Sequence, residues 1–321
     1  MFKFFVFIFF LFSLGSCGEI KEEGKLSSHN IDAMSEFGTT ASNVFFYYKD
    51  LEGATKFYRE TMGFRVAADY GFAKVMQVAN KSFITLVDAS KGMHGADDPK
   101  TTAIALITDQ LDGWWNYISS AGVEMRTSVY KKIEGRPHHG FVAVDPEGYL
   151  LEFETFNPHP ENEKLMPLLD KIETLYPEEG RSSVPNGLGF KATVLWFYYK
   201  DMEGIQNFYE NILGFDLNVD QGWAKIYPIS QTGFFGPVDE TRGMHHYTDK
   251  KAVTLSIITD NIEGWHGYMS RHPDIEMRSE EIRDSEWYRS FVAYDPEAYY
   301  LEWNVFKDVL ENKTLNEAVR K

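Results

Sequence analysis

The side chains best suited to proton transfer lie around one expected hairpin, residues 138–156. If its turn is centred tightly on the Pro146–Glu147 bond, residues pair symmetrically about that bond, and His139, Glu152 and Glu154 share one face. An imidazole beside carboxylates is a workable acid–base pair. A structural His–Glu hydrogen bond explains the same pattern, and a β-bulge would move His139 to the other face.

A second expected hairpin carries an arginine where the first carries His139. The same symmetric pairing places Arg289 opposite Asn304 and diagonal to Glu302, which Arg289 would then neutralise. A structural ion pair accounts for this arrangement, although an arginine–carboxylate pair inside a cavity can also hold a polar ligand. The first hairpin is therefore the better candidate for chemistry, and the second for binding or for scaffolding.

Both hairpins belong to an internal repeat with an offset of 151 residues, or 150 near its end. The clearest matches are 46–50 with 197–201 (FYYKD), 92–94 with 243–245 (GMH), and 145–147 with 295–297 (DPE). The two copies span 41–157 and 191–307. Repeats that keep their register over this length indicate two similar domains.

Each copy divides into two modules of the order βαβββ. In the first copy, short apolar runs predict strands at 44–48, 74–78 and 83–87, with a helix at 51–62 that Gly63 ends. The second half predicts a strand at 103–107, a helix at 111–120, and strands at 124–130, 141–144 and 149–156. We therefore expect an α+β protein of four βαβββ modules.

The segments outside the copies have simpler expectations. Residues 158–190 form a linker, in which leucines and isoleucines at helical spacing predict a helix over 161–176. Residues 17–40 read as a flexible polar tether and residues 308–321 as a polar tail.

The first 17 residues predict a lipid anchor. Lys3 precedes an apolar run at 4–14, which is too short for an ordinary membrane-spanning helix but typical of a signal peptide over 1–16. Cys17, the only cysteine, ends a Leu-Gly-Ser-Cys segment that resembles the bacterial lipobox. We expect acylation of Cys17, attachment to the membrane at the cell envelope, and a domain that faces the periplasm or the surface. A plain signal peptide with an incidental cysteine is the alternative.

Composition excludes several function classes. The chain has 32 basic and 48 acidic residues, a net charge of −16, which opposes binding to nucleic acid. Neither a dinucleotide-binding fingerprint nor a Gly-x-Ser-x-Gly nucleophile motif occurs. Aromatic residues make up 16% of the chain, so aromatic-lined cavities are possible, although large cores use the same side chains.

Taken together, the modules resemble the vicinal-oxygen-chelate superfamily, which includes glyoxalase I, bleomycin-resistance proteins and extradiol dioxygenases. The resemblance rests on strands that end in Lys-Asp or Thr-Asp, on the Phe-Tyr…Gly-Phe helix, and on the segment DPEGYLLEF at 145–153. It implies two glyoxalase-like domains whose strands curl into incomplete barrels. In metal-dependent members, a divalent ion in the barrel binds two neighbouring oxygens of the substrate.

The resemblance also implies positions for the metal ligands, and most of them hold unsuitable residues. These positions are Asn43, Thr102 and Glu152 in the first copy and Val194, Val253 and Glu302 in the second. An amide is a poor ligand for a transition metal, a threonine hydroxyl is poorer, and valine offers none. We therefore expect no cofactor. If a divalent metal does bind, Glu152 with His139 would hold it.

The same geometry would give each cavity an aromatic wall. Asn43, Phe45 and Tyr47 alternate along the first strand of copy one, as Trp196 and Tyr198 do in copy two. Such walls suit a flat or apolar small molecule, or they fill the cavity completely. The loop histidines at 94, 245 and 246 could form a pocket rim or simply be exposed.

Three hypotheses follow. The leading one is a metal-free protein that binds a small aromatic or apolar molecule at the cell envelope. The second is an enzyme of the lyase, isomerase or dioxygenase type that uses Glu152 and His139 in the first copy. The third is a structural or partner-docking lipoprotein. In each case we expect the two copies to pair with each other or across a homodimer.

Overall fold

The computed structural model describes residues 32–320, which belong to one unit, Ile31–Lys321. The expected signal peptide and Cys17 lie outside the described residues. Within residues 32–320, no helix has the length and apolar character needed to cross a membrane.

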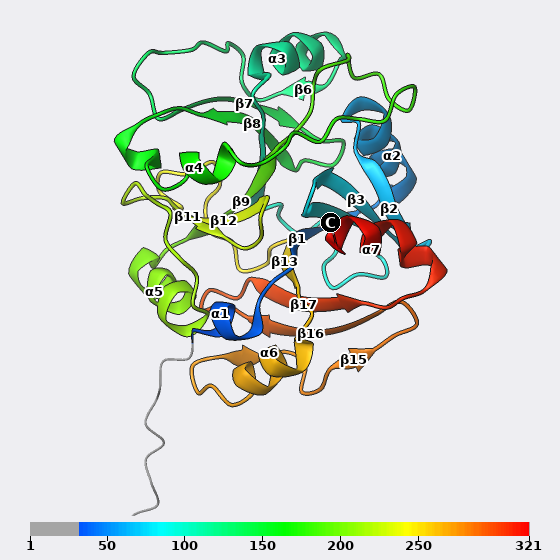
Figure 1. The fold of residues 1–321 in the computed structure, drawn as a ribbon, viewed down its shortest axis with the longest axis vertical. Coiled ribbons are helices and arrows are strands. Elements are labelled where there is room, and N and C mark those ends of the chain that lie inside the picture. Colours follow the sequence, from blue (N-terminus) through cyan, green and yellow to red (C-terminus); the bar gives the residue numbers. More distant parts are fainter. Residues whose placement is uncertain (1–31, 321) are drawn as a thin grey trace, which may run out of the picture. The chain divides into compact units, whose positions relative to one another are not determined.

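Four modules with the order strand, helix and three strands make up most of the chain (Figure 1). Module 1 contains β1 (Ala41–Tyr48), α2 (Leu51–Lys56) with the π-helical turn η1 (Phe57–Thr61), β2 (Arg65–Asp69), β3 (Ala73–Ala79) and β4 (Ser82–Asp88). Module 2 contains β5 (Thr102–Ile107), α3 (Leu111–Ser120), β6 (Glu124–Met125), β7 (His138–Val144) and β8 (Leu150–Phe156).

The second copy repeats this order. Module 3 contains β9 (Ala192–Tyr199), α5 (Met202–Asn207) with η3 (Phe208–Ile212), β10 (Val219–Asp220), β11 (Lys225–Pro228) and β12 (Gly233–Asp239). Module 4 contains β13 (Val253–Ile258), α6 (Ile262–Met269), β14 (Glu276–Met277), the extra strand β15 (Arg283–Asp284), β16 (Tyr288–Tyr294) and β17 (Tyr300–Phe306). The expected α+β fold is therefore present, in two open sheets.

Each sheet combines one module from each copy. The first sheet has the order β14-β16-β17-β13-β1-β4-β3-β2, so modules 4 and 1 form it, and β15 pairs with β16. The second has the order β10-β11-β12-β9-β5-β8-β7-β6, from modules 3 and 2. The antiparallel pairs β1–β13 and β5–β9 join the modules. The concave faces are thus shared between the copies and do not belong to one copy each.

The main core lies on the faces of the sheets opposite these concave surfaces. Helices α2, α3, α5 and α6 cover it, each with a buried aromatic residue in the helix itself or in the turn that continues it. Trp114 of α3 and Trp265 of α6 are fully buried. Trp114 packs against Phe153 of β8, and Trp265 packs against Trp303 of β17.

Three peripheral segments differ from their sequence-based expectations. The linker is helical only at η2 (Pro160–Asn162) and α4 (Met166–Leu169), because Pro160 and Pro167 are tolerated only near the start of a helix. The expected tail contains η4 (Leu310–Asn312) and α7 (Lys313–Arg320), whose Leu315 packs in a cluster with residues of β2. Within the expected tether, α1 (Ala33–Phe37) contacts α6.

A buried aspartate joins the two modules within each copy. Asp145, in the turn between β7 and β8, accepts hydrogen bonds from the hydroxyls of Tyr48 and Tyr58 at 2.7 and 3.0 Å. Its second oxygen accepts from the backbone N–H groups of Glu147 and Tyr149 at 2.9 and 2.8 Å. The repeated Asp-Pro-Glu segment is therefore a structural clamp between the two sheets.

The second copy has the same clamp, with one strained residue. Asp295 accepts from Tyr199, Tyr209 and two backbone N–H groups. Gly148 of the first turn has φ +100°, whereas the corresponding residue of the second turn is Ala298 with φ 64°. A left-handed conformation costs a residue with a Cβ roughly 1–2 kcal/mol.

Replacing Ala298 by glycine should stabilise the protein. The relief of strain exceeds the extra entropy of glycine in the unfolded chain, so we expect a gain of roughly 0.5–1 kcal/mol in the free energy of unfolding. Urea unfolding followed by tryptophan fluorescence measures it. Gly148→Ala, the reverse change in the first copy, should destabilise, and a gain there would contradict the explanation.

Removal of the Asp145 carboxylate should be strongly destabilising. Asp145→Ala leaves two buried phenols and two backbone N–H groups without their acceptor, so we expect a loss of about 3 kcal/mol or more. Asp216→Ala, at an exposed aspartate, serves as the control and should change stability by less than about 0.5 kcal/mol. Equal effects of the two substitutions on the urea midpoint would refute the clamp.

Candidate ligand-binding cavities

Two cavities occupy equivalent positions on the concave faces of the two sheets. Cavity 1, of about 590 Å³, is enclosed by β1, β3 and β4 of module 1 and by β16 and β17 of module 4. Cavity 2, of about 220 Å³, is enclosed by strands of modules 2 and 3. A volume of several hundred Å³ is typical of small-molecule sites, so cavity 1 is the larger candidate.

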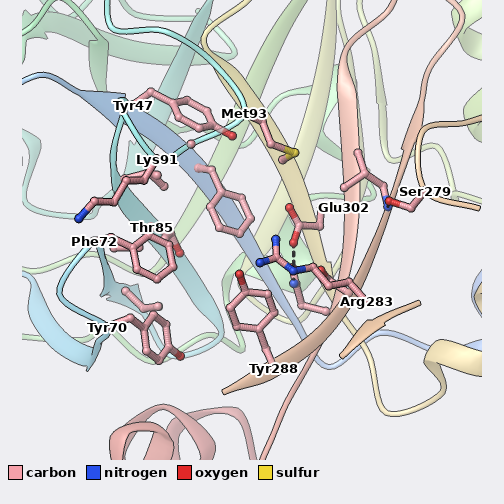
Figure 2. Close-up of a pocket in the computed structure, with 18 of the residues that line it drawn as sticks. Tyr47, Tyr70, Phe72, Thr85, Lys91, Met93, Ser279, Arg283, Tyr288 and Glu302 are labelled. Carbon is pink, nitrogen blue, oxygen red and sulfur yellow. Dashed lines mark hydrogen bonds between the residues drawn. The ribbon is translucent and has the colours of Figure 1, made fainter. Parts of the chain in front are cut away.

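Most of the wall of cavity 1 is apolar or aromatic. The apolar lining residues are Phe45, Phe72, Ala73, Val75, Val87, Met93, Val292 and Phe306, and three tyrosines add hydroxyl groups, Tyr47, Tyr70 and Tyr288. Figure 2 shows Tyr47, Tyr70 and Phe72 on one side and Tyr288 on the other. Tyr47 is buried, and its hydroxyl lies 2.8 Å from the Thr254 hydroxyl, which fixes the ring. Burial raises the pKa of Tyr47, so it stays neutral.

The charged groups of cavity 1 are mostly positive. Lys91, Arg278 and Arg283 line it with exposed side chains, and Glu302 is its buried carboxylate (Figure 2). Glu302 accepts a hydrogen bond of 2.9 Å from the amide of Asn304. Burial raises the pKa of Glu302, and the two arginines act in the opposite direction.

Cavity 2 has the same framework with different side chains. Trp196, Tyr198, Trp223 and Phe156 form its aromatic wall. Its polar lining residues are Arg126, His138, Glu152, Glu154, Gln221 and Arg242.

Two carboxylates and an imidazole meet inside cavity 2. Glu154 is 1% exposed, and its Oε1 contacts Nδ1 of His138. This contact raises the pKa of His138. Burial and the neighbouring Glu154 raise the pKa of Glu152, which favours its protonated form. The arrangement can hold a proton among three groups.

The predicted register of both hairpins is wrong by one residue. His138 pairs with Phe156 and His139 with Thr155, so His138 faces cavity 2 and His139 faces away. The turn from Asp145 to Tyr149 has five residues, because the Asp145 carboxylate binds the N–H groups of Glu147 and Tyr149. A two-residue turn was assumed, and an odd loop length inverts the faces.

The same turn corrects the role of Arg289. It pairs with Val305 and not with Asn304, and its guanidinium binds Glu263 of α6 on the opposite face. Arg289 therefore does not neutralise Glu302. Arg278 and Arg283 are the arginines that lower the pKa of Glu302, and neither was predicted from the sequence as a site residue.

The residues present do not fit the family metal. Strand register places Asn43, Ser256 and Glu302 side by side in the first sheet. There, Oδ1 of Asn43 accepts from Thr85 at 3.0 Å, and Ser256 donates to Asn304 at 2.6 Å. The second sheet has a single carboxylate in the corresponding row, which is Val194, Ala105 and Glu152. Within residues 32–320, no three His, Cys, Asp or Glu side chains are grouped to hold a metal ion.

Other predicted site residues fall into two groups. Phe45 and Tyr47 line cavity 1, and Trp196 and Tyr198 line cavity 2. Asn43 is buried but does not line the cavity, and its Nδ2 has no partner among the described residues. Thr102 and Val253 lie opposite Phe197 and Phe46, on the strand faces away from the cavities. Neither can contribute to a ligand site.

The repeated Gly-Met-His segment closes one side of each cavity. A Cβ at Gly92 would lie 2.6 Å from the Tyr47 ring, so only glycine permits this approach. Met93 lines cavity 1 and contacts Arg278 at 3.1 Å, whereas His94 is buried against Tyr47. Desolvation lowers the pKa of His94 to about 4, so it is neutral. In the second copy Gly243 and His245 pack against Tyr198 in the same way, and Arg126 binds the backbone carbonyl of Met244, but His246 is exposed.

The internal repeat could have identified four of the basic residues that line the two cavities. Lys91 and Arg242 both precede the Gly-Met-His segment, and Arg126 and Arg278 both follow a Glu-Met pair, so a basic residue recurs at each of these positions. Their repetition in both copies marks them as equivalent. Arg283 lies in β15, a strand that the first copy lacks, and no sequence signal identifies it.

Comparisons with known proteins agree with this architecture. A sequence model of the Glyoxalase/Bleomycin resistance protein/Dioxygenase superfamily matches residues 40–153. The search of curated proteins found no significant match.

Solved structures resemble the chain over most of its length. Glyoxalase I from Zea mays has a TM-score of 0.57 and 14% identity, and covers 90% of this chain and 98% of its own. A single-residue variant of the same maize enzyme gives a TM-score of 0.58 with the same identity and coverage. A Bacillus subtilis protein provisionally named a dioxygenase has a TM-score of 0.56 and 15% identity, over 83% of this chain and 85% of its own.

At such identities the structural likeness establishes the fold alone. The sequence match covers only modules 1 and 2. Residues 40–153 thus match the Glyoxalase/Bleomycin resistance protein/Dioxygenase superfamily, and the four modules together have the tandem glyoxalase-like fold.

Proposed function

We propose that the protein binds a small molecule in cavity 1, without a metal ion, at the cell envelope. One observation carries the proposal: a cavity of about 590 Å³ has an aromatic and apolar wall and a mouth with three cations. Pockets of this kind bind ligands through apolar contact and use a few polar groups to fix orientation.

The charges define the class of ligand. Arg278 and Arg283 against Glu302 give cavity 1 a net charge of +1 when Glu302 is ionised, and Lys91 lies 3.8 Å from the carboxylate of Asp88. Within the described residues, neither arginine has a carboxylate oxygen within 4.0 Å. A positive cavity in a chain with a net charge of −16 attracts anions. The ligand is therefore a flat apolar or aromatic molecule with an anionic group.

The residues beside Glu302, at the positions of the family's metal ligands, also support a metal-free binding role. Neutral groups already hydrogen-bonded to one another occupy the places of the family ligands beside Glu302. The superfamily that residues 40–153 match includes bleomycin resistance proteins as well as enzymes, so a binding role lies within its range.

The location is the second part of the proposal. The Leu-Gly-Ser-Cys segment at 14–17 follows an apolar run and contains the only cysteine of the chain. Acylation there would hold the cavities close to the membrane surface, because two or more acyl chains anchor a protein stably.

Replacing Arg283 by glutamine should weaken the binding of an aromatic carboxylate. With 2-naphthoate as the probe, we expect a Kd at least about tenfold higher, because a charge-assisted hydrogen bond contributes about 1.5–3 kcal/mol. Isothermal titration calorimetry measures the change. The neutral analogue 2-naphthamide should bind the unmodified protein more weakly than 2-naphthoate does.

Arg289 provides the matched control. It lies on the opposite face of β16, where it binds Glu263, so Arg289→Gln should leave the affinity for 2-naphthoate unchanged. An equal loss in both variants would point to the overall charge of the protein. No binding of either probe at millimolar concentration would count against cavity 1 as a site for aromatic anions.

Substitution of Cys17 should release the protein from the membrane. In a bacterial host, we expect the unmodified protein to sediment with membranes and to enter the detergent phase, because its thiol and amino terminus carry acyl chains. Cys17→Ser should move it to the soluble fraction. Membrane association that persists in this variant would contradict lipid anchoring.

A further inference from the structure

The acidic and the basic side chains of cavity 2 lie at different depths. Glu154 is buried, with 1% exposure, and the neighbouring Glu152 is half-buried on the same strand face. Arg126 and Arg242 also line the cavity but are exposed. Carboxyl groups therefore lie at the floor of the cavity and guanidinium groups at its mouth.

One carboxylate oxygen at the floor lacks a partner. Oε1 of Glu154 contacts His138, but Oε2 is buried and has no hydrogen-bond partner among the described residues. Buried polar atoms in proteins are nearly always hydrogen-bonded, by the protein, by water or by a ligand. This oxygen lies in a residue that lines cavity 2, so it can accept a hydrogen bond from a ligand there.

The arginines at the mouth are held in place without being neutralised. The guanidinium of Arg242 lies 5.0 Å from the ring centre of Trp223, and Arg126 donates to the carbonyl of Met244 at 3.0 Å. In residues 32–320, no carboxylate oxygen lies within 4.0 Å of either guanidinium. Both can therefore still bind an anionic group.

The wall between floor and mouth is aromatic. Trp196, Tyr198, Trp223 and Phe156 line it, and the indole N–H of Trp196 has no partner among the described residues. A ring placed between these side chains gains stacking contacts.

From these features we infer that cavity 2 binds a zwitterion, with its amine at Glu152 and Glu154, its carboxylate at Arg126 and Arg242, and an apolar or aromatic core between them. This site is separate from cavity 1 and does not depend on the function proposed for it. A simple cation is disfavoured because the arginines repel it on entry. A simple anion is disfavoured because it would leave Oε2 of Glu154 without a hydrogen-bond donor.

Three matched probes separate these cases. The zwitterion 4-(aminomethyl)benzoate carries both groups, benzylamine lacks the carboxylate, and benzoate lacks the amine. Indole ¹⁵N–¹H spectra report on the site, since Trp196 and Trp223 line cavity 2 and neither lines cavity 1. Trp196→Phe and Trp223→Phe assign the two resonances. This readout distinguishes cavity 2 from any binding of benzoate in cavity 1.

We expect the zwitterion to shift both indole resonances with a Kd at least about tenfold below those of benzylamine and benzoate. Glu154→Gln should remove this preference over benzoate, and Arg242→Gln should remove the preference over benzylamine. Because Arg242 is exposed, its substitution tests the site even if Glu154→Gln fails to fold. His139→Ala, on the other strand face, should change neither.

Each other outcome overturns the inference. Equal affinity for benzylamine would make cavity 2 a cation site, and equal affinity for benzoate would make it an anion site. Absence of indole shifts with all three probes at millimolar concentration would show that the cavity takes no ligand of this class.

Discussion

The antiparallel pairing of β1 with β13 and of β5 with β9 is the constraint on which the rest of the structure depends. Each pair joins a module of one copy to a module of the other, so neither sheet can form from a single copy. Each cavity consequently has one wall from each copy. The aspartate clamps join modules of the same copy that lie in different sheets, since Asp145 binds Tyr48 and Asp295 binds Tyr199. Together, these contacts connect all four modules in a ring.

This arrangement lets two equivalent cavities diverge without a change of fold. Position by position, Tyr288 and Asn304 of cavity 1 correspond to His138 and Glu154 of cavity 2. All four lie on cavity-facing strand positions, where a substitution changes the chemistry and leaves the backbone hydrogen bonds intact. The smaller volume of cavity 2 agrees with its larger aromatic residues, because Trp196 and Trp223 replace Phe45 and Phe72.

Much of the fold could be predicted from the sequence because the repeat and the apolar periodicity are local signals. The helix predicted at 111–120 is α3 as observed, and the positive φ of Gly63 fits the predicted helix end. Sheet membership could not be predicted, because both within-copy and between-copy pairing satisfy the same pattern. Tail helix α7 was missed because most of its residues are polar, although Leu315, Ala318 and Val319 pack together on one side of it.

The candidate site was predicted less well for a specific physical reason. Assigning residues to cavity faces requires the register of the hairpins, and the register depends on one side chain, Asp145, which lengthens the turn to five residues. The misassignment of His139 and Arg289 follows from that single difference. First-strand residues escaped the error, since their alternation does not depend on a turn, and Tyr47 and Tyr198 do line the cavities.

Both copies retain a glutamate on the last strand, although the other metal positions have changed. A buried carboxylate is unfavourable unless hydrogen bonds or charges compensate it. Glu302 is compensated by Asn304 and by the arginines at the mouth of cavity 1. Glu152 has a weaker set of partners, because Glu154 opposes its charge and His138 is already engaged. The first cavity is thus electrostatically complete except for an anion, whereas the second retains a buried carboxylate oxygen, Oε2 of Glu154, that a ligand amine would satisfy.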